Sequence, residues 1–280
     1  MNLKRIKKMF MVMCLLAFTA LCTGCGAKVK TDVKIRSSST ADYTISFGID
    51  DEMLQAIATM SEVSEKELID EMTKDGLKYS TEISGGITYH VFTMSEKKVK
   101  LSKIEDMLEE MGYTNVCLKK DYFFASYKPQ NSPATTEDID ELMKEFAKET
   151  GLDASDFHCY QTISIQLKGT IKNTNGKVSK SNKKCVTWTQ KNFNKARNFY
   201  ASTSSTKKTA TVKNIKNGRT YKIGKKGKAI KIANASSAAR IRLNGKTIKN
   251  GKIIKKAGKY RLTIWSKTGK CKTTTFKITK

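Results

Sequence analysis

Acidic side chains are absent from the C-terminal part of this 280-residue chain, in which Asp156 is the last acidic residue. From Lys168 to Lys280 there are 33 lysines and arginines and no aspartate or glutamate. The other 20 of the 53 basic residues and all 26 acidic residues lie in the part up to Gln166, whose net charge is therefore −6. A densely cationic segment without carboxylate partners of its own attracts anions.

Residues that carry catalysis or bind metals are also scarce. The chain has two histidines, His90 and His158, and neither lies in a motif with a nucleophile. Residues 224–228 contain glycines and lysines but lack the Gly-Lys-Ser/Thr ending of a phosphate-binding P-loop. Four cysteines of the mature chain are widely spaced: Cys117, Cys159, Cys185 and Cys271. A zinc site needs clustered ligands. We expect no metal, no cofactor and no enzymatic activity, and all three disulfide pairings of these cysteines stay open.

A hydrophobic run long enough to span a membrane is missing as well. The apolar run from Met9 to Cys22 is shorter than the roughly 18 to 20 residues that cross a bilayer. It follows a positively charged segment made by Lys4, Arg5, Lys7 and Lys8. This order of charge and apolar run predicts a cleaved signal peptide instead of a permanent transmembrane helix.

The apolar run ends in Leu21-Cys22-Thr23-Gly24-Cys25, which resembles the lipobox of bacterial lipoproteins. One position departs from that pattern, because Cys22 stands where leucine is usual. The resemblance implies that residues 1–24 are a signal peptide and that Cys25 carries lipid, with palmitate among its acyl chains. The mature chain would then be anchored on the extracytoplasmic face of the cell membrane. An uncleaved anchor and an ordinary signal peptide are the alternatives.

Between residues 25 and 200, short strands and helices follow one another without strict βαβ spacing. Period-two alternation predicts strands at 29–35 and 43–49, and Ser84-Gly85-Gly86 is typical of a hairpin turn. Helical spacing of apolar residues predicts helices at 101–111 and 139–147. These patterns favour an α+β domain with helices on one face of a mainly antiparallel sheet.

Polar residues mark the expected helix starts in this domain. Ser64 and Glu67 have the spacing of a capping box. Asp50, Asp51 and Glu52 stand where another helix begins. Two roles are open for this acidic group: helix capping with a favourable dipole interaction, or metal binding and acid–base chemistry.

Residues 201–208 are predicted to be a polar linker, and residues 209–280 a basic domain of about seven short strands. Asn217-Gly218, Asn244-Gly245 and Asn250-Gly251 are candidate type I′ hairpin turns. This spacing of strands and turns is typical of a small β-sandwich.

Three segments of the C-terminal domain form a recognisable pattern: 241–245, Gly258-Lys259-Tyr260-Arg261-Leu262-Thr263-Ile264 and the final strand Thr274 to Ile278. This pattern resembles the bacterial Ig-like domains of surface proteins. In those domains the turn before the last strand carries Asp and a Gly-Asn pair, whereas here it reads Ser266-Lys267-Thr268-Gly269-Lys270. The resemblance implies an Ig-like sandwich over roughly the last 70 residues.

Three segments of the N-terminal part, residues 25–200, form a second pattern together with Gly24-Cys25: 84–89, 167–176 and Cys185-Val186-Thr187-Trp188. This pattern resembles the LppM-type lipoprotein family. Lys168 stands where the family usually has proline. The resemblance implies a membrane-attached envelope protein, and as one possibility a curved sheet that holds lipid.

Binding through the cationic C-terminal domain is the leading expectation. The expected anion-binding residues lie on one strand and in turns: Lys225, Lys226, Lys228, Arg240, Arg242, Lys246 and Lys249. Expected partners outside the cell are anionic wall polymers or phospholipid head groups. Nucleic acid is not expected, because interleaved exposed aromatic residues are lacking. A basic surface that only keeps the protein soluble is the simpler alternative.

Seven methionines remain after the signal peptide, nearly all on predicted helix faces. They fit either a plain core or an apolar cavity that accommodates lipid. The second choice gives the alternative function, a lipid-binding or lipid-handling protein that acts through its N-terminal domain.

Overall fold

The computed structural model describes residues 26–74, 76–128, 158–191 and 196–280. The chain is mostly β-sheet with few helices and forms two compact units. One unit holds the described residues up to Thr114 together with Tyr127–Gln166 and Thr187–Arg197. The other holds Asn115–Ser126, Leu167–Val186 and Asn198–Lys280. The predicted helix at 139–147 lies outside the described residues.

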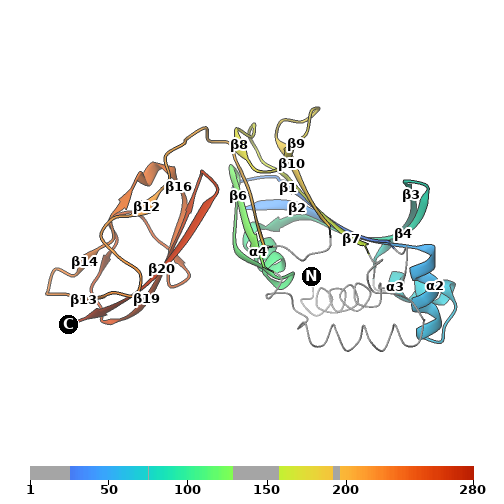
Figure 1. Cartoon of the computed structure of the whole chain (residues 1–280), viewed down its shortest axis with the longest axis horizontal. Helices are drawn as coiled ribbons and strands as arrows, with labels where there is room; N and C mark the ends of the chain where they lie inside the picture. Colours follow the sequence, from blue (N-terminus) through green and yellow to red (C-terminus); the bar gives the residue numbers. More distant parts are fainter. Residues whose placement is uncertain (1–25, 75, 129–157, 192–195) are drawn as a thin grey trace. The chain divides into compact units, whose positions relative to one another are not determined.

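The largest sheet has seven strands in the order β3-β4-β2-β1-β7-β10-β9 (Figure 1). Its strands are β1 (Gly26–Ile35), β2 (Thr40–Asp50), β3 (Lys78–Ser84), β4 (Ile87–Lys100), β7 (His158–Gln166), β9 (Lys177–Val178) and β10 (Cys185–Lys191). Pairing is antiparallel along β1, β2, β4 and β3, whereas β1 and β7 are parallel. The expected mixture of a mainly antiparallel sheet and helices is therefore present in this unit.

Alternation along the strands gives this sheet one apolar and one polar face. On β2, the buried residues Tyr43, Ile45 and Phe47 alternate with Thr44 and Ser46. The helix α4 (Leu101–Glu110) contacts β2 and β4 and buries Ile104 and Leu108. Two further helices, α2 (Asp51–Met60) and α3 (Glu65–Lys74), follow the end of β2 (Figure 1). Helix packing on the apolar face leaves the polar face to solvent, as antiparallel sheets allow.

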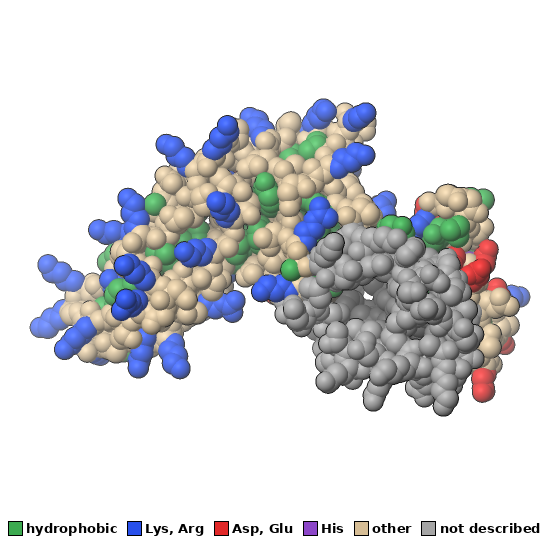
Figure 2. All heavy atoms as spheres, viewed as in Figure 1, with side chains coloured by type: hydrophobic (Ala, Val, Ile, Leu, Met, Phe, Trp, Pro, Cys, Tyr) green, Lys and Arg blue, Asp and Glu red, His purple; other side chains and the backbone are tan. Residues whose placement is uncertain are grey.

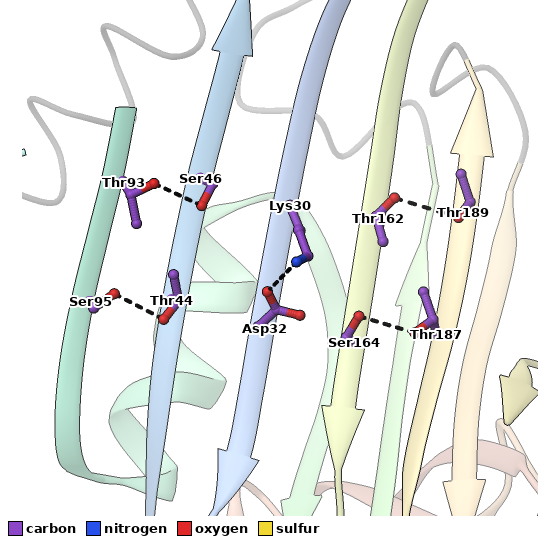
Figure 3. A network of polar contacts seen from close by, with 10 residues as sticks. All are labelled: Lys30, Asp32, Thr44, Ser46, Thr93, Ser95, Thr162, Ser164, Thr187 and Thr189. Carbon is purple, nitrogen blue, oxygen red and sulfur yellow. Dashed lines mark hydrogen bonds and ion pairs between the residues drawn. The ribbon is translucent and has the colours of Figure 1, made fainter. Parts of the chain in front are cut away.

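Hydroxyl pairs cross the polar face from strand to strand (Figure 3). Thr44 and Ser95 hydroxyls are 2.9 Å apart, and those of Ser164 and Thr187 are 3.1 Å apart. Cross-strand pairs of this kind stabilise a sheet by a few tenths of a kcal/mol, about 0.2–1 each. This face contributes polar contacts but no apolar core.

The helix starts have the expected caps. Asp50 caps α2, because its Oδ1 accepts a hydrogen bond of 3.0 Å from the Met53 backbone N–H. Ser64 and Glu67 form the capping box before α3, with the Ser64 N–H 2.9 Å from Glu67 Oε2 and the Glu67 N–H 3.2 Å from Ser64 Oγ. Capping explains Asp50 and Glu67 without metal binding.

The C-terminal residues of the second unit form nine strands, of which all but β19 and β20 are short, where about seven short strands were expected. They are β12 (Thr211–Val212), β13 (Thr220–Lys222), β14 (Lys228–Ala229), β15 (Ile232–Ala233), β16 (Ala238–Leu243), β17 (Lys246–Thr247), β18 (Ile253–Ile254), β19 (Gly258–Ser266) and β20 (Lys270–Thr279). Five of them make one sheet in the order β13-β20-β19-β16-β17, and β12-β15 and β14-β18 are two-stranded sheets. A core of isoleucines with Leu262 and Phe276 lies among these sheets.

The second unit also includes a four-stranded sheet in the order β5-β6-β11-β8. These strands are β5 (Tyr113–Lys119), β6 (Tyr122–Tyr127), β8 (Asn173–Thr174) and β11 (Arg197–Ser202). Cys117, Tyr122 and Phe124 pack in one buried cluster with Ala239 and Trp265.

The two units do not follow the boundary that the sequence suggested at residues 200–209. Ala201 and Ser202, expected to begin a linker, are buried at the end of β11. The Tyr122 hydroxyl donates a 2.9 Å hydrogen bond to the Ser266 carbonyl, and Trp265 Nε1 donates one of 2.7 Å to the Asn115 carbonyl. Such contacts explain why residues 115–126 belong with the C-terminal strands.

One of the three expected Asn-Gly hairpin turns joins paired strands. Asn244 and Gly245, with φ of 47° and 78°, connect β16 to β17. The expectation is wrong for the other two turns, because the strands on either side of each turn do not pair with each other. Their asparagines instead bind other strands. Asn217 Oδ1 accepts from the Thr275 N–H at 2.8 Å, and Asn250 Oδ1 accepts from the Ile232 N–H at 2.8 Å.

Candidate anion-binding surface

Five of the seven expected anion-binding residues are lysines in turns and edge strands of the second unit. Lys225, Lys226, Lys246 and Lys249 are exposed. Lys228 is half-buried in β14, with its ammonium 4.1 Å from the centre of the Tyr221 ring. Such a cation–π contact directs the Lys228 charge toward the protein.

The two expected arginines on β16 are half-buried and held by the protein itself. Arg240 donates a 3.3 Å hydrogen bond to the Leu118 carbonyl. The Arg242 guanidinium lies 5.5 Å from the Trp265 ring centre. The structure therefore gives Arg240 and Arg242 positions in which their guanidinium groups support the fold.

Other cations of the same unit come together in an open groove of about 450 Å³. The groove is lined by Lys259, Arg261 and Lys277 with Gly218, Asn244, Tyr260, Thr275 and Phe276. The strands β19 and β20 form its floor, and their antiparallel register pairs Lys259 directly with Lys277 and Arg261 with Thr275. Paired residues have Cβ atoms about 5 Å apart, so two lysines face each other across the strands.

The Asn217-Gly218 and Asn244-Gly245 turns contribute to the groove. The Gly218 N–H donates to the Thr275 carbonyl at 2.7 Å, which fixes the first turn against β20. Asn244 is fixed to β19, because its Oδ1 accepts from the Arg261 N–H at 2.7 Å. Each turn is thus anchored to a strand that carries groove cations.

No carboxylate from residues 209–280 offsets the groove cations, since this segment contains no acidic residue. On the face in view, lysine and arginine side chains extend from β12 to β20 with no acidic side chain among them (Figure 2). Like charges directly opposite each other destabilise a strand pair. An anion between Lys259 and Lys277 would remove that repulsion.

Sequence reasoning missed Lys259, Arg261 and Lys277. Their strand alternation was visible, because Lys259 and Arg261 flank Tyr260 on β19 and Lys277 follows Phe276 on β20. The short turn at residues 266–270 limits the register of this hairpin and is compatible with Lys259 opposite Lys277. The part that the distant Gly218 and Asn244 turns play in the groove could not be read from the sequence.

A second polar group, in the N-terminal unit, joins Tyr79, His90 and Asp51. The Tyr79 hydroxyl is 2.6 Å from His90 Nδ1, and His90 Nε2 is 2.6 Å from Asp51 Oδ1. Burial, with Asp51 and Glu65 nearby, raises the pKa of Tyr79. The phenol therefore stays protonated at neutral pH, and the group acts as a tie between β3, β4 and α2.

Thiol and metal chemistry find little support in the described residues. Burial raises the pKa of Cys271 to about 12, so its thiol is not an activated nucleophile. No group of three or more metal-ligating side chains occurs in the parts of the chain that the structure describes. Within those same parts, no helix is long and apolar enough to cross a bilayer.

Comparisons with known proteins give one weak structural relationship. The sequence matches no protein-family model and no curated protein. The folded domain of LppM from Mycobacterium tuberculosis, solved by NMR, is similar with a TM-score of 0.32 and 8% identity. The similarity covers 64% of this chain and 89% of that chain.

Proposed function

We propose that this protein is a lipid-anchored bacterial surface protein that binds phosphate-bearing anions through its cationic C-terminal part, without catalysis. The observation that carries the proposal is the direct pairing of Lys259 with Lys277, beside Arg261, in a groove without a carboxylate from its own segment. Each lysine or arginine near an anionic lipid surface contributes about 1 kcal/mol. Three groove cations and the exposed lysines around them therefore supply enough attraction for binding at low salt.

The anchor in this proposal is lipid on Cys25 after removal of residues 1–24. The lipobox-like ending of the apolar run supports it, and it implies that the mature chain lies on the extracytoplasmic face of the cell membrane. Anionic wall polymers and phospholipid head groups are the phosphate-bearing partners available there. Replacing Cys25 with serine should release the chain from the membrane fraction in a high-salt wash, because salt screens the attraction of the C-terminal part to lipid head groups.

We further propose that residues 209–280 are an Ig-like β-sandwich and that the seven-stranded sheet with its helices forms an LppM-type domain. The five-stranded sheet, the two small sheets and the isoleucine-rich core are compatible with a sandwich. Sequence motifs such as Val186 and Trp188, both buried on β10, support the second assignment. The cationic groove would then lie on the Ig-like sandwich, since all its lining residues belong to residues 209–280.

Sedimentation of the unlipidated Cys25→Ser chain with three kinds of binding partner tests the proposed binding, because acyl chains on Cys25 would insert into any vesicle. Vesicles of phosphatidylglycerol supply lipid phosphate, a phosphate-bearing wall polymer supplies phosphate without lipid, and phosphatidylcholine vesicles have no net charge. We expect binding to the first two and weak binding to the third. Binding to the vesicles alone would assign the site to lipid head groups, and binding to the polymer alone to the wall. Equal binding to all three would contradict the proposal.

A further inference from the structure

The tip of the β3–β4 hairpin exposes two isoleucines. Ile83 is 77% exposed and Ile87 is 42% exposed. Between them, Gly85 and Gly86 have φ of 64° and 82°, and no other atom lies within 4 Å of where a Cβ would be at either glycine. The turn thus projects into solvent with an isoleucine on each side. Large apolar side chains in so exposed a place contribute nothing to a core.

The two isoleucines lie on opposite faces of the hairpin. Ile83 pairs with Thr88, whereas Ile87 pairs with Ser84, and neighbouring positions along a strand point to opposite faces. The tip is therefore apolar on both sides. The strand β3 is also the edge of the seven-stranded sheet and buries none of its side chains.

This tip lies at the end of the sheet where the mature chain begins. One row across the sheet runs from Ala27 to Ile49, His90 and Thr81. Ile83 is two residues beyond that row, and Gly26, the first described residue of β1, is one residue beyond it in the same direction. Gly26 directly follows Cys25 in the sequence. Three strand spacings separate β1 from β3, which is about 14 Å. A lipid on Cys25 would thus place the membrane close to the hairpin tip.

Side chains that favour a membrane–water interface lie near this end. Tyr160 pairs with Lys28 and is 37% exposed. The Lys28 ammonium lies 3.4 Å from the centre of the Tyr89 ring. Tyrosine and lysine are typical of the headgroup level of a bilayer. Asp51 and Glu82 lie at the same end of the sheet, so attraction to anionic lipid does not explain the position of the two isoleucines.

We infer that the β3–β4 hairpin tip, with Ile83 and Ile87, inserts into the apolar region of the membrane beside the lipid anchor. This inference rests on the proposed acylation of Cys25. The anchor fastens one point of the chain, and the hairpin adds a second point, three strand spacings or about 14 Å from β1. Two points of attachment would fix the orientation of the N-terminal unit on the membrane, which one flexible acyl attachment does not.

Tryptophan fluorescence in the full, lipidated chain tests the insertion. The test variant is Ile83→Trp, and the matched control is Ile253→Trp, an isoleucine of β18 that is 47% exposed. The native Trp188 and Trp265 are 2% and 3% exposed and give a constant background. Each variant is reconstituted into phosphatidylcholine vesicles with brominated acyl chains, because neutral lipid removes the contribution of the cationic C-terminal part.

We expect the bromine atoms to quench the added tryptophan of I83W and not that of I253W. Emission of I83W that stays quenched by aqueous iodide, in a chain shown by mass spectrometry to be acylated, would overturn the inference. A chain without acylation would instead overturn the proposed anchor. Concentration-dependent dimerisation through β3, with no bromine quenching, would overturn the proposed insertion, because the hairpin tip would then bind a second copy of the chain.

Partition of the unlipidated Cys25→Ser chain into neutral vesicles gives a second measurement. Transfer of one isoleucine side chain out of water changes an equilibrium roughly tenfold. The double variant Ile83→Ser/Ile87→Ser should therefore bind at least tenfold more weakly than the parent, while Ile253→Ser should not. Equal partition of the parent and both variants would contradict insertion.

Discussion

Adjacent acidic residues at the start of α2 have different partners. Asp50 is buried and accepts from the Met53 N–H, whereas the more exposed Asp51 carboxylate pairs with His90. The sequence showed that this group precedes a helix, and it left capping and metal chemistry open. Which of the two aspartates caps the helix depends on the φ and ψ of Asp50, which the sequence does not show.

Replacing Asp50 with alanine should lower the free energy of unfolding by about 1–2 kcal/mol, because the α2 cap is buried. Asp51→Asn should cost less than about 1 kcal/mol, since exposed ion pairs contribute little. Urea unfolding followed by circular dichroism compares the two variants. An equal loss in both would contradict the assignment of Asp50 as the cap.

Asp42 should make the stability of the fold depend on pH in a direction that follows from its contacts. The Arg36 guanidinium, which donates to Asp42 Oδ2 at 2.6 Å, lowers the pKa of this carboxyl, and the Lys98 N–H adds a second hydrogen bond. A carboxyl with a lowered pKa in the folded state stabilises the fold above its unfolded pKa of about 3.9. That contribution is lost as the pH falls through the lower, folded-state value.

Asp42→Asn should therefore destabilise the chain at pH 7, by less than about 1 kcal/mol because the pair is partly exposed. The difference from the parent should shrink as the pH falls below 4. Unfolding measured from pH 7 to pH 2.5 checks this, with Asp32→Asn as a control from the Lys30–Asp32 surface pair. A difference that grows toward low pH would show that the sign is wrong.

Strands and helices of the described N-terminal residues were largely predictable at the scale of elements. Period-two alternation gave β1 and β2, and the Ser84-Gly85-Gly86 turn gave β3 and β4. The parallel pairing of β1 with β7 was not predictable, because about 120 residues separate the two strands and no local pattern links them. The whole groove could not be predicted either, because it also needs the Asn217-Gly218 turn, which contacts Thr275 across 58 residues of sequence.

The Asn244-Gly245 turn fixes the hairpin of β16 and β17. Gly245 has φ of 78°, a conformation that costs other residues about 1–2 kcal/mol. Gly245→Ala should therefore lower the free energy of unfolding by about 1 kcal/mol. Gly224→Ala is the matched control, because Gly224 lies in a turn of the same unit with open space and no positive φ. Equal thermal stability of the two variants would argue against the strained turn.

For the whole molecule, the sequence identified the charge asymmetry but not the division into units. Residues 115–126 lie in the acidic half of the sequence, yet they belong to the cationic unit. Contacts such as Tyr122 with Ser266 span more than 140 residues and leave no trace in local composition. Net charge, in contrast, adds up along the chain, so the cationic character of the C-terminal part could be known without the fold.

The salt dependence of binding to phosphatidylglycerol vesicles tests the central claim most directly. All chains carry Cys25→Ser, so that no acyl chain contributes to binding. The parent is compared with the groove variant Lys259→Gln/Arg261→Gln/Lys277→Gln and with a control, Lys66→Gln/Lys103→Gln, that removes exposed lysines of α3 and α4. The account predicts binding that weakens steeply between about 0.05 and 0.5 M salt, because screening shortens the reach of each charge. At low salt the groove variant should lose about 3 kcal/mol, roughly 100-fold in affinity, and the control should bind as the parent does. Binding that is insensitive to salt, equal in the groove variant and the parent, or absent both here and with the phosphate-bearing wall polymer would contradict it.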